Sequence, residues 1–373
     1  MKKSLIALAV LAASGTAMAQ SSVTLFGIVD ANVTHVNHAT AAGKSMTGMG
    51  HSGNATSRLG FRGVEDLGGG LKAGFWLEGA VSNDDGNGTG AGAGPGFAFK
   101  RRSTVSLMGN FGEVRLGRDL VPSYTKVSSY DVFGQVGIGQ FMGWNTWSQV
   151  SNLTPAAVAA DNADANGFRQ SNMLAYYTPN FGGFTAGLGY GLDERTAGGH
   201  AGRYMGGFVA YDNGPFSITG ALDRRDVLYT NAFAPLADGK KDMYSLGVAY
   251  DAGMAKISAM AQQTRFKSIP TATGTTDNKV NAYLIGAAAP VGAGQFRIQY
   301  ALYDQKAIDS KAHQLSLGYV HNLSKRTAVY GTLAHIRNKN NSNLALASTG
   351  VANAGPGVGN NQTGLSLGVR HSF

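Results

Sequence analysis

The carboxyl-terminal stretch contains a spacing that many hydrolases use for their nucleophile. Gly364, Ser366 and Gly368 match Gly-x-Ser-x-Gly, in which the serine sits on a sharp turn between a strand and a helix. Only five residues follow Gly368, too few for that helix, and no acid follows to support His371. The serine and glycines alternate with leucines, and this period of two predicts an uninterrupted strand. We therefore reject a catalytic serine here.

Other groups that commonly carry chemistry are dispersed. The eight histidines form no His-Glu-x-x-His motif and no cluster with carboxylates at metal-ligand spacing. The glycine-rich stretch 88–96 lacks the Lys-Ser/Thr of a phosphate-binding loop. The net charge of +9 comes from scattered residues rather than a basic run, which disfavours nucleic-acid binding. We expect no enzyme, no metal, no cofactor and no nucleic-acid partner.

What remains is a set of basic residues on the polar faces of predicted strands. It comprises Arg58, Arg62, Arg101, Arg169, Lys256, Arg297 and Arg370. Arginine stays protonated at physiological pH, so several arginines lining a narrow water-filled space would attract anions. For any single arginine there is an equally good alternative explanation: a barrel wall that borders water carries charged side chains simply because they are solvated.

Strands with one apolar and one mostly polar face must hold these side chains. Val23, Leu25 and Val29 alternate with more polar neighbours, and similar alternation returns in 71–82, 242–250 and 295–304. We predict sixteen strands, at residues 22–36, 57–65, 71–82, 99–108, 113–119, 168–178, 184–192, 203–211, 216–226, 242–250, 255–266, 279–289, 295–304, 313–321, 326–337 and 363–373.

Short and long connections take turns between these strands. Seven are short, at 65–70, 109–112, 179–183, 212–215, 251–254, 290–294 and 322–326, and eight are long, at about 37–56, 83–98, 120–166, 193–202, 227–241, 267–278, 305–312 and 338–362. This pattern is typical of an outer-membrane β-barrel, which must close because lipid offers no partner to a free backbone group. A soluble sandwich or propeller is the competing fold, but charged faces would make a poor core.

The amino terminus and the composition agree with export. Residues 1–19 combine two lysines, a short apolar run and Ala17-Met18-Ala19, as in a secretory signal peptide. No later segment reaches about 18 consecutive apolar residues, and the chain contains no cysteine. We therefore predict an all-β chain with a signal peptide at 1–19 and one pore domain at 20–373.

Several ordered stretches resemble the trimeric sixteen-stranded general porins of Gram-negative outer membranes, close to their anion-preferring branch. They are SVTLFGIVDA at 22–31, SRLGFRGVEDLG at 57–68, FGEVRLGR at 111–118, YYTPNFGGF at 176–184 and the terminal Phe373. The resemblance implies a multi-pass outer-membrane channel for passive diffusion of small hydrophilic solutes and ions, with anions preferred. It also implies a homotrimer surrounded by outer-membrane lipid.

The resemblance further implies that the long third loop, 120–166, folds into the barrel and narrows it. The basic ladder of the family matches Arg58, Arg101 and Arg169, and Arg62 shares the inward parity of Arg58. Asp131 is the best candidate for a loop acid that faces the ladder, with Asp119 behind it.

Two further expectations concern the partner and the solute. Gly27, Ala31, Thr104 and Ser106 are expected to face outward, where small or polar residues suit a protein interface better than lipid. A substrate-specific channel is the alternative function, and it would need an aromatic track, for which Trp76, Trp144 and Trp147 are candidates.

Overall fold

The computed structural model describes residues 22–88, 96–144, 155–156, 167–196, 199–231 and 234–373. The signal peptide predicted at 1–19 lies outside the described residues. Within them, no helix combines the length and apolarity needed to cross a membrane. The strands are β1 (Ser22–Val36), β2 (Met46–His51), β3 (Arg58–Gly68), β4 (Leu71–Ala80), β5 (Arg102–Gly109), β6 (Gly112–Leu120), β7 (Pro155–Ala156), β8 (Arg169–Tyr177), β9 (Phe184–Gly191), β10 (Tyr204–Asn213), β11 (Phe216–Asn231), β12 (Ala234–Asp251), β13 (Lys256–Thr271), β14 (Gly274–Val291), β15 (Gly294–Gln305), β16 (Ser310–Asn322), β17 (Thr327–Asn340) and β18 (Gln362–Ser372).

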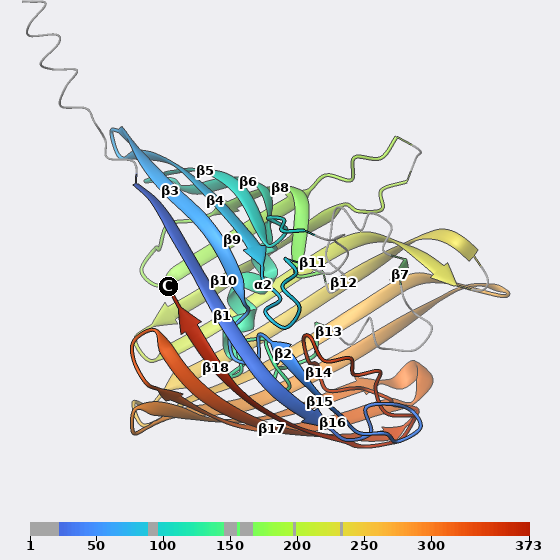
Figure 1. The fold of residues 1–373 in the computed structure, drawn as a ribbon. Coiled ribbons are helices and arrows are strands. Elements are labelled where there is room, and N and C mark those ends of the chain that lie inside the picture. Colours follow the sequence, from blue (N-terminus) through green and yellow to red (C-terminus); the bar gives the residue numbers. More distant parts are fainter. Residues whose placement is uncertain (1–21, 89–95, 145–154, 157–166, 197–198, 232–233) are drawn as a thin grey trace, which may run out of the picture.

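Sixteen of these eighteen strands form the wall of one closed antiparallel barrel (Figure 1). The other two are the short β2, which extends the sheet beside the end of β1, and the two-residue β7, which pairs with β11. The barrel closes where β1 pairs with β18, from Ile28 opposite Ser372 to Val36 opposite Gly364. The predicted fold is confirmed, and no edge strand is left in the wall.

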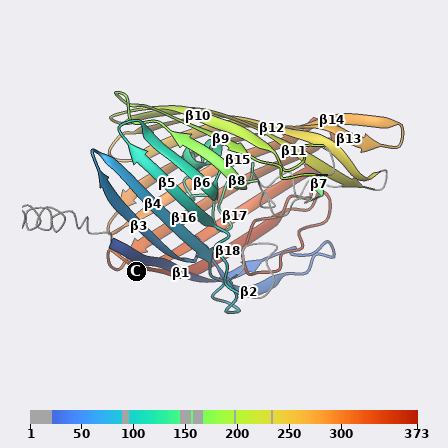
Figure 2. The same ribbon diagram turned by 90° about the horizontal axis from the view of Figure 1, so that it is seen from above.

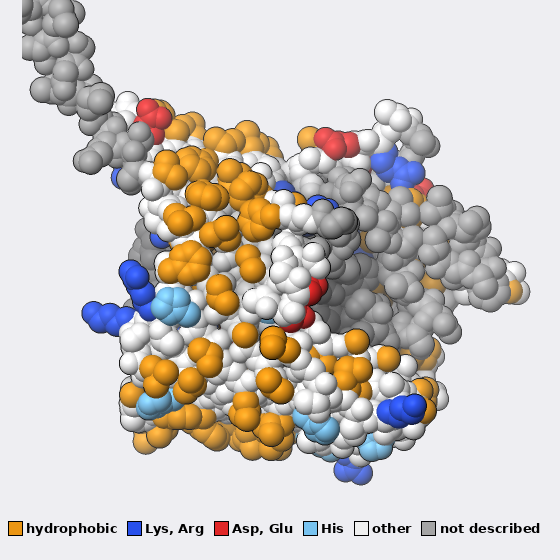
Figure 3. All heavy atoms as spheres, viewed as in Figure 1, with side chains coloured by type: hydrophobic (Ala, Val, Ile, Leu, Met, Phe, Trp, Pro, Cys, Tyr) orange, Lys and Arg blue, Asp and Glu red, His pale blue; other side chains and the backbone are white. Residues whose placement is uncertain are grey.

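The two faces of the wall follow the period-two pattern. Val23, Leu25 and Val33 on β1 are more than half exposed on the outside, whereas Asp30 is fully buried on the inside. In β18, Leu365 and Leu367 face outward, and inward-facing Ser366 accepts a hydrogen bond from Thr34. The space-filling view shows apolar side chains spread over this outer face (Figure 3). An apolar exterior matches a hydrocarbon environment.

The seven short connections all join strands at one end of the barrel, as predicted. At the other end, two predicted long loops, 227–241 and 267–278, prove to be mostly strand, and 305–312 is shortened to the 3-10 turn η2 (Lys306–Ile308) between β15 and β16. β11 and β12 extend to Asn231 and Ala234, and β13 and β14 extend to Thr271 and Gly274. Tyr229 and Ile269 in these extensions pack with Phe266 and Val280 at the ends of the predicted strands, and this buried apolar cluster holds the hairpins in place beyond those ends.

Candidate functional site

The described part of the third long connection runs along the inside of the barrel, whose strands are seen from above in Figure 2. It begins with helix α2 (Pro122–Val127) and the 3-10 turn η1 (Ser128–Tyr130), and Figure 1 places α2 within the wall. The Tyr130 hydroxyl lies 2.9 Å from Ser217 Oγ and 2.8 Å from Thr219 Oγ1 on β11. Further along, Gln314 on β16 donates to the Ile138 and Gln140 carbonyls. The loop is therefore fixed to the inner wall from β11 to β16.

Apolar contacts explain why this loop lies inside rather than above the barrel. Five loop residues, Val127, Tyr130, Ile138, Phe141 and Met142, are buried against inward-facing residues of β12 to β17. Small wall residues leave room for them. A side chain at Gly247 would meet the Tyr130 ring, and one at Gly286 would meet Val132. Removing apolar surface from water stabilises the inserted position.

A second cluster fixes the start of the loop. The ring of Tyr124 stacks on Phe168 with centroids 4.6 Å apart, and Trp144 meets both rings edge-on. Because Trp144 is only 1% exposed, it cannot line a track for a solute. Trp147 lies outside the described residues, so Trp76 alone of the three tryptophans stands on the described lumen wall.

Asp131 lies inside the loop and not opposite the arginines. Its carboxylate accepts hydrogen bonds from the backbone N–H groups of Phe133, Gln135 and Phe141 and from the Gln135 side chain. The residue is 4% exposed. Burial raises the pKa of the Asp131 carboxyl, although these N–H donors act in the opposite direction. Asp131 therefore organises the loop turn, and the structure does not place it as the acid facing the ladder.

The opposite wall, formed by β3 to β6 and β8, carries the four arginines predicted for the constriction, Arg58, Arg62, Arg101 and Arg169, whereas Arg297 and Arg370 lie on β15 and β18. Glu78 on β4 is the acid at the centre of the four. Its Oε1 lies 2.6 Å from Arg101 Nε and 3.7 Å from Arg58 Nη1. Arg169 donates through Nε to the Arg101 carbonyl at 2.9 Å. Three predicted ladder residues thus come together from β3, from the segment before β5 and from β8.

Trp76, two residues before Glu78, lies between two further arginines. The Arg62 guanidinium carbon is 5.0 Å from the Trp76 ring centroid and 5.2 Å from that of Phe26, and the Arg102 carbon is 4.5 Å from Trp76. The indole N–H donates to Glu78 Oε2 at 3.2 Å. Cation–π contacts of this kind hold guanidinium groups in place without cancelling their charge.

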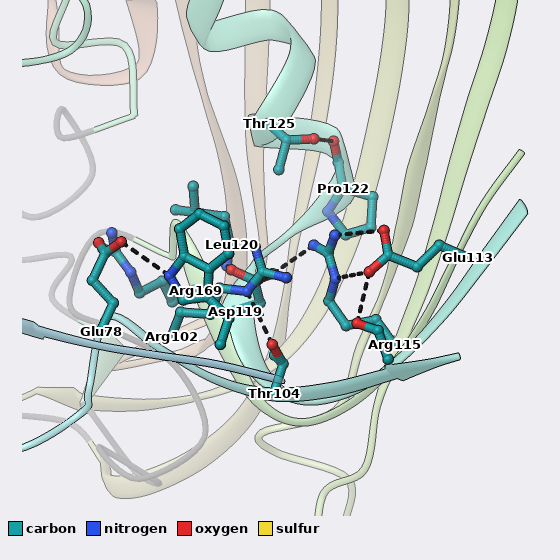
Figure 4. Close-up of polar contacts among 12 residues, drawn as sticks. Glu78, Arg102, Thr104, Glu113, Arg115, Asp119, Leu120, Pro122, Thr125 and Arg169 are labelled. Atoms are coloured by element: carbon teal, nitrogen blue, oxygen red, sulfur yellow. Dashed lines mark hydrogen bonds and ion pairs between the residues drawn. The ribbon is translucent and has the colours of Figure 1, made fainter. Parts of the chain in front are cut away.

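Asp119 at the end of β6 completes the network. It lies 2.6 Å from Arg115 Nη1 and 3.3 Å from Arg102 Nε, and Arg115 also pairs with Glu113 at 2.9 Å. Figure 4 shows Arg102, Asp119, Arg115 and Glu113 in sequence across the wall, with the start of α2 beside them. Asp119 is thus among the arginines and not on a facing loop.

We call this network the arginine wall. Its members are Arg58, Arg62, Arg101, Arg102, Arg115 and Arg169 with Glu78, Glu113 and Asp119, so positive charges exceed negative ones by three. Within residues 121–144 of the loop, the charged side chains are Lys126, which pairs with Asp212, and buried Asp131. The described part of the loop therefore offers no free acid to offset the surplus.

The sequence interpretation missed Glu78, Glu113, Arg102 and Arg115. It assigned Arg101 to the inward face of its strand, which put Thr104 and Ser106 outside. β5 begins at Arg102, and Thr104 and Ser106 face inward, where they bond to Arg102 and Glu113. Arg101 reaches the lumen from the segment before the strand. The apolar side chains of Val105 and Leu107, which face outward, could have revealed this, because residues an odd number of positions away, such as Arg102, then face inward.

A closed sixteen-stranded barrel that holds a long loop within its wall defines the class of water-filled outer-membrane channels. Residues 5–341 match the family model of Gram-negative porins. The chain belongs to that family.

Known relatives cover the chain completely. It is 58% identical to outer membrane porin protein 32 of Delftia acidovorans and 30% identical to an outer membrane porin protein of Bordetella pertussis, each over 100% of both chains. The solved structure of an anion-selective porin from Comamonas acidovorans superposes with a TM-score of 0.84 at 54% identity, covering 95% of this chain and 100% of that one.

These findings confirm the predicted family, channel function and location. The protein is a multi-pass outer-membrane porin that conducts by diffusion through its lumen. The relatives are channels rather than enzymes.

Proposed function

We propose that this porin prefers anions and that the arginine wall, facing the inserted third loop at 120–166, is its constriction. The surplus of three positive charges on one wall carries the proposal, because the described loop segment adds no free acid. Charges act strongly only where the passage is narrow, since screening reduces their effect beyond about 8 Å at physiological salt. The similarity to a porin described as anion-selective supports the same conclusion.

The selectivity should be moderate. One arginine about 4 Å from an anion contributes roughly 1 kcal/mol through water. Several of the six arginines already share a carboxylate, so their attraction is partly offset. A several-fold preference for chloride over potassium is expected, without a site that traps the anion.

Zero-current potentials in planar bilayers under a KCl gradient test the proposal. Wild type should show chloride preferred, and Arg101→Glu should move the potential toward potassium. Arg326→Glu, in the exposed turn between β16 and β17, makes the same change in charge away from the arginine wall and should leave the potential unaltered. A wild-type preference for potassium, or equal effects of the two variants, would overturn the proposal.

We also propose that the protein assembles as a homotrimer. Ala31 on β1 lies on the outer face between Val29 and Val33, where its small side chain leaves a surface that fits protein better than lipid, whereas the Phe373 ring covers Gly27. Light scattering of the detergent-solubilised, unheated protein measures the assembly. An Ala31→Trp variant should reduce the trimer fraction if this face is the interface, and a monomeric wild type or an unchanged trimer fraction in Ala31→Trp would contradict the proposal.

A further inference from the structure

A second basic cluster lies on the outside of the barrel, near the end that carries the long loops. On β16, Lys311, His313 and Leu315 alternate along the outer face, and on β17 Leu333, His335, Arg337 and Lys339 do the same. The register sets Lys311 opposite Lys339 and His313 opposite Arg337. The porin function uses none of these residues, because they do not face the lumen.

The pair Lys311 and Lys339 lowers the stability of the folded barrel when no counter-charge lies between them, since like charges directly opposite each other on neighbouring strands repel. Among the described residues, no ion pair within 4 Å involves Lys311, Arg337 or Lys339, although Asp304 on β15 is opposite Lys311 in register. A bound anion would offset the repulsion.

The surface between these side chains is hollow. Tyr300, His313, Leu315, His335, Arg337 and Lys339 line a depression of about 380 Å³. The Tyr300 hydroxyl lies 2.6 Å from His313 Nδ1 and so orients the imidazole ring. Nε2 of the same ring is buried and has no hydrogen-bond partner among the described residues. An oxygen-rich anion in the hollow would supply one.

The level of the cluster identifies the kind of anion. Leu315 and Leu333, below the cationic residues, are each 44% exposed and belong to the apolar band. Lys311 and Leu315 are four positions apart, roughly 13 Å along a strand and less along the tilted barrel axis. This places the cations at the headgroup level of the outer leaflet and the leucines beside acyl chains. A free phosphate would contact only the cationic residues of such a site and would leave the leucines without a partner.

We propose that the hollow between β15 and β17 binds the phosphate of an acylated outer-leaflet lipid. Arg337 and Lys339 contact the phosphate, because guanidinium and ammonium groups bind phosphate oxygens by charge-assisted hydrogen bonds. His313 donates from Nε2. The acyl chains lie along Leu315 and Leu333.

Native mass spectrometry of the intact porin in detergent tests this site, with diphosphorylated, acylated glucosamine disaccharide (lipid A) as the probe. The double variant R337Q/K339Q should lose at least fivefold in bound lipid. K325Q/R326Q removes the same charge from the exposed turn at the opposite end of β16 and β17, and should bind as wild type does. R337K/K339R keeps the charge and should retain binding.

Unheated gel mobility and channel conductance verify that each variant is folded. Equal lipid binding by R337Q/K339Q and wild type would overturn the proposal, and so would equal binding of the dephosphorylated lipid to wild type. The ion preference of the pore should be the same in all these variants, so the test is independent of the proposed anion selectivity.

Discussion

Glu78 Oε1 forms an ion pair with Arg101 Nε at 2.6 Å, and Glu78 Oε2 accepts a hydrogen bond from the Trp76 indole N–H. The Glu78 carboxylate therefore offsets part of the positive charge of Arg101 and, at 3.7 Å, of Arg58. It also fixes the Trp76 ring, which the Arg62 and Arg102 guanidinium groups contact. If the arginine wall is the constriction as proposed, ion preference should depend on this acid as well as on the arginines.

Glu78→Gln should therefore raise the preference for anions. The amide keeps an acceptor for Trp76 but removes one negative charge, so the surplus on the arginine wall increases from three to four. An interaction of about 1 kcal/mol limits the change in the chloride-to-potassium permeability ratio to roughly fivefold. Reversal potentials in a salt gradient measure it. Glu65→Gln, exposed at the turn end of β3, is the matched control, and an unchanged ratio in Glu78→Gln would exclude Glu78 from the constriction.

Tyr130→Phe should loosen the inserted loop. The change removes the hydroxyl that bridges Ser217 and Thr219 and leaves the ring in place, at a cost of about 1–2 kcal/mol. Faster hydrogen exchange is expected at the amides of residues 128–142, together with noisier single-channel currents. Tyr319→Phe removes a hydroxyl that bonds to Val291 near the short turns, and it should leave the loop amides unaffected. Equal exchange in both variants would show that Tyr130 does not anchor the loop.

Gly27→Val should weaken the closure of the barrel. Gly27 exchanges two backbone hydrogen bonds of 3.0 Å with Phe373, and an added Cβ would meet the Phe373 ring and lie 2.9 Å from the Arg58 carbonyl oxygen. Overpacking of this kind costs about 1–3 kcal/mol, which should lower the temperature at which the folded band disappears on gels. Gly220→Val, on β11, meets nothing within 4 Å and should have little effect. Equal losses in both variants would contradict this explanation.

Acidification should destabilise the outer hairpin that contains β2. Burial lowers the pKa of His51, against the opposing influence of Asp84, 3.8 Å away, and of Asp85 and Asp30. The unfolded imidazole, with a pKa near 6.5, then binds protons that the folded one resists, so stability falls as the pH drops below about 6.5. Hydrogen exchange of residues 46–51, corrected for the intrinsic rate, should accelerate between pH 7 and pH 5.5. The acceleration should disappear in His51→Gln.

The strands could be predicted because alternation is a local property of the chain. Val23 and Leu25 on one side and Asp30 on the other define the faces of β1 without any knowledge of its neighbours. The hairpin extensions could not be predicted in the same way, since Tyr229 and Val280 are far apart in sequence and become an apolar cluster only when β11 to β14 are paired.

The site was predictable where a residue acts from within a regular strand. Arg58 and Arg62 follow the parity of β3. Arg101 was predicted to be an inward-facing residue of a strand. It does reach the predicted neighbours, but from the segment that precedes β5. The role of Asp131 depends on three backbone N–H groups that converge after the loop folds, and no spacing rule describes that arrangement.

The inserted loop is attached to the inner wall from β11 to β16, whereas the arginine wall occupies the other side of the lumen. If the arginine wall is the constriction as proposed, an anion in transit should be drawn sideways, so that its path follows β3 to β6 instead of the barrel axis. A dipolar solute should turn its negative end toward the arginine wall and its positive end toward the loop. Such a passage should select solutes by orientation as well as by size and charge.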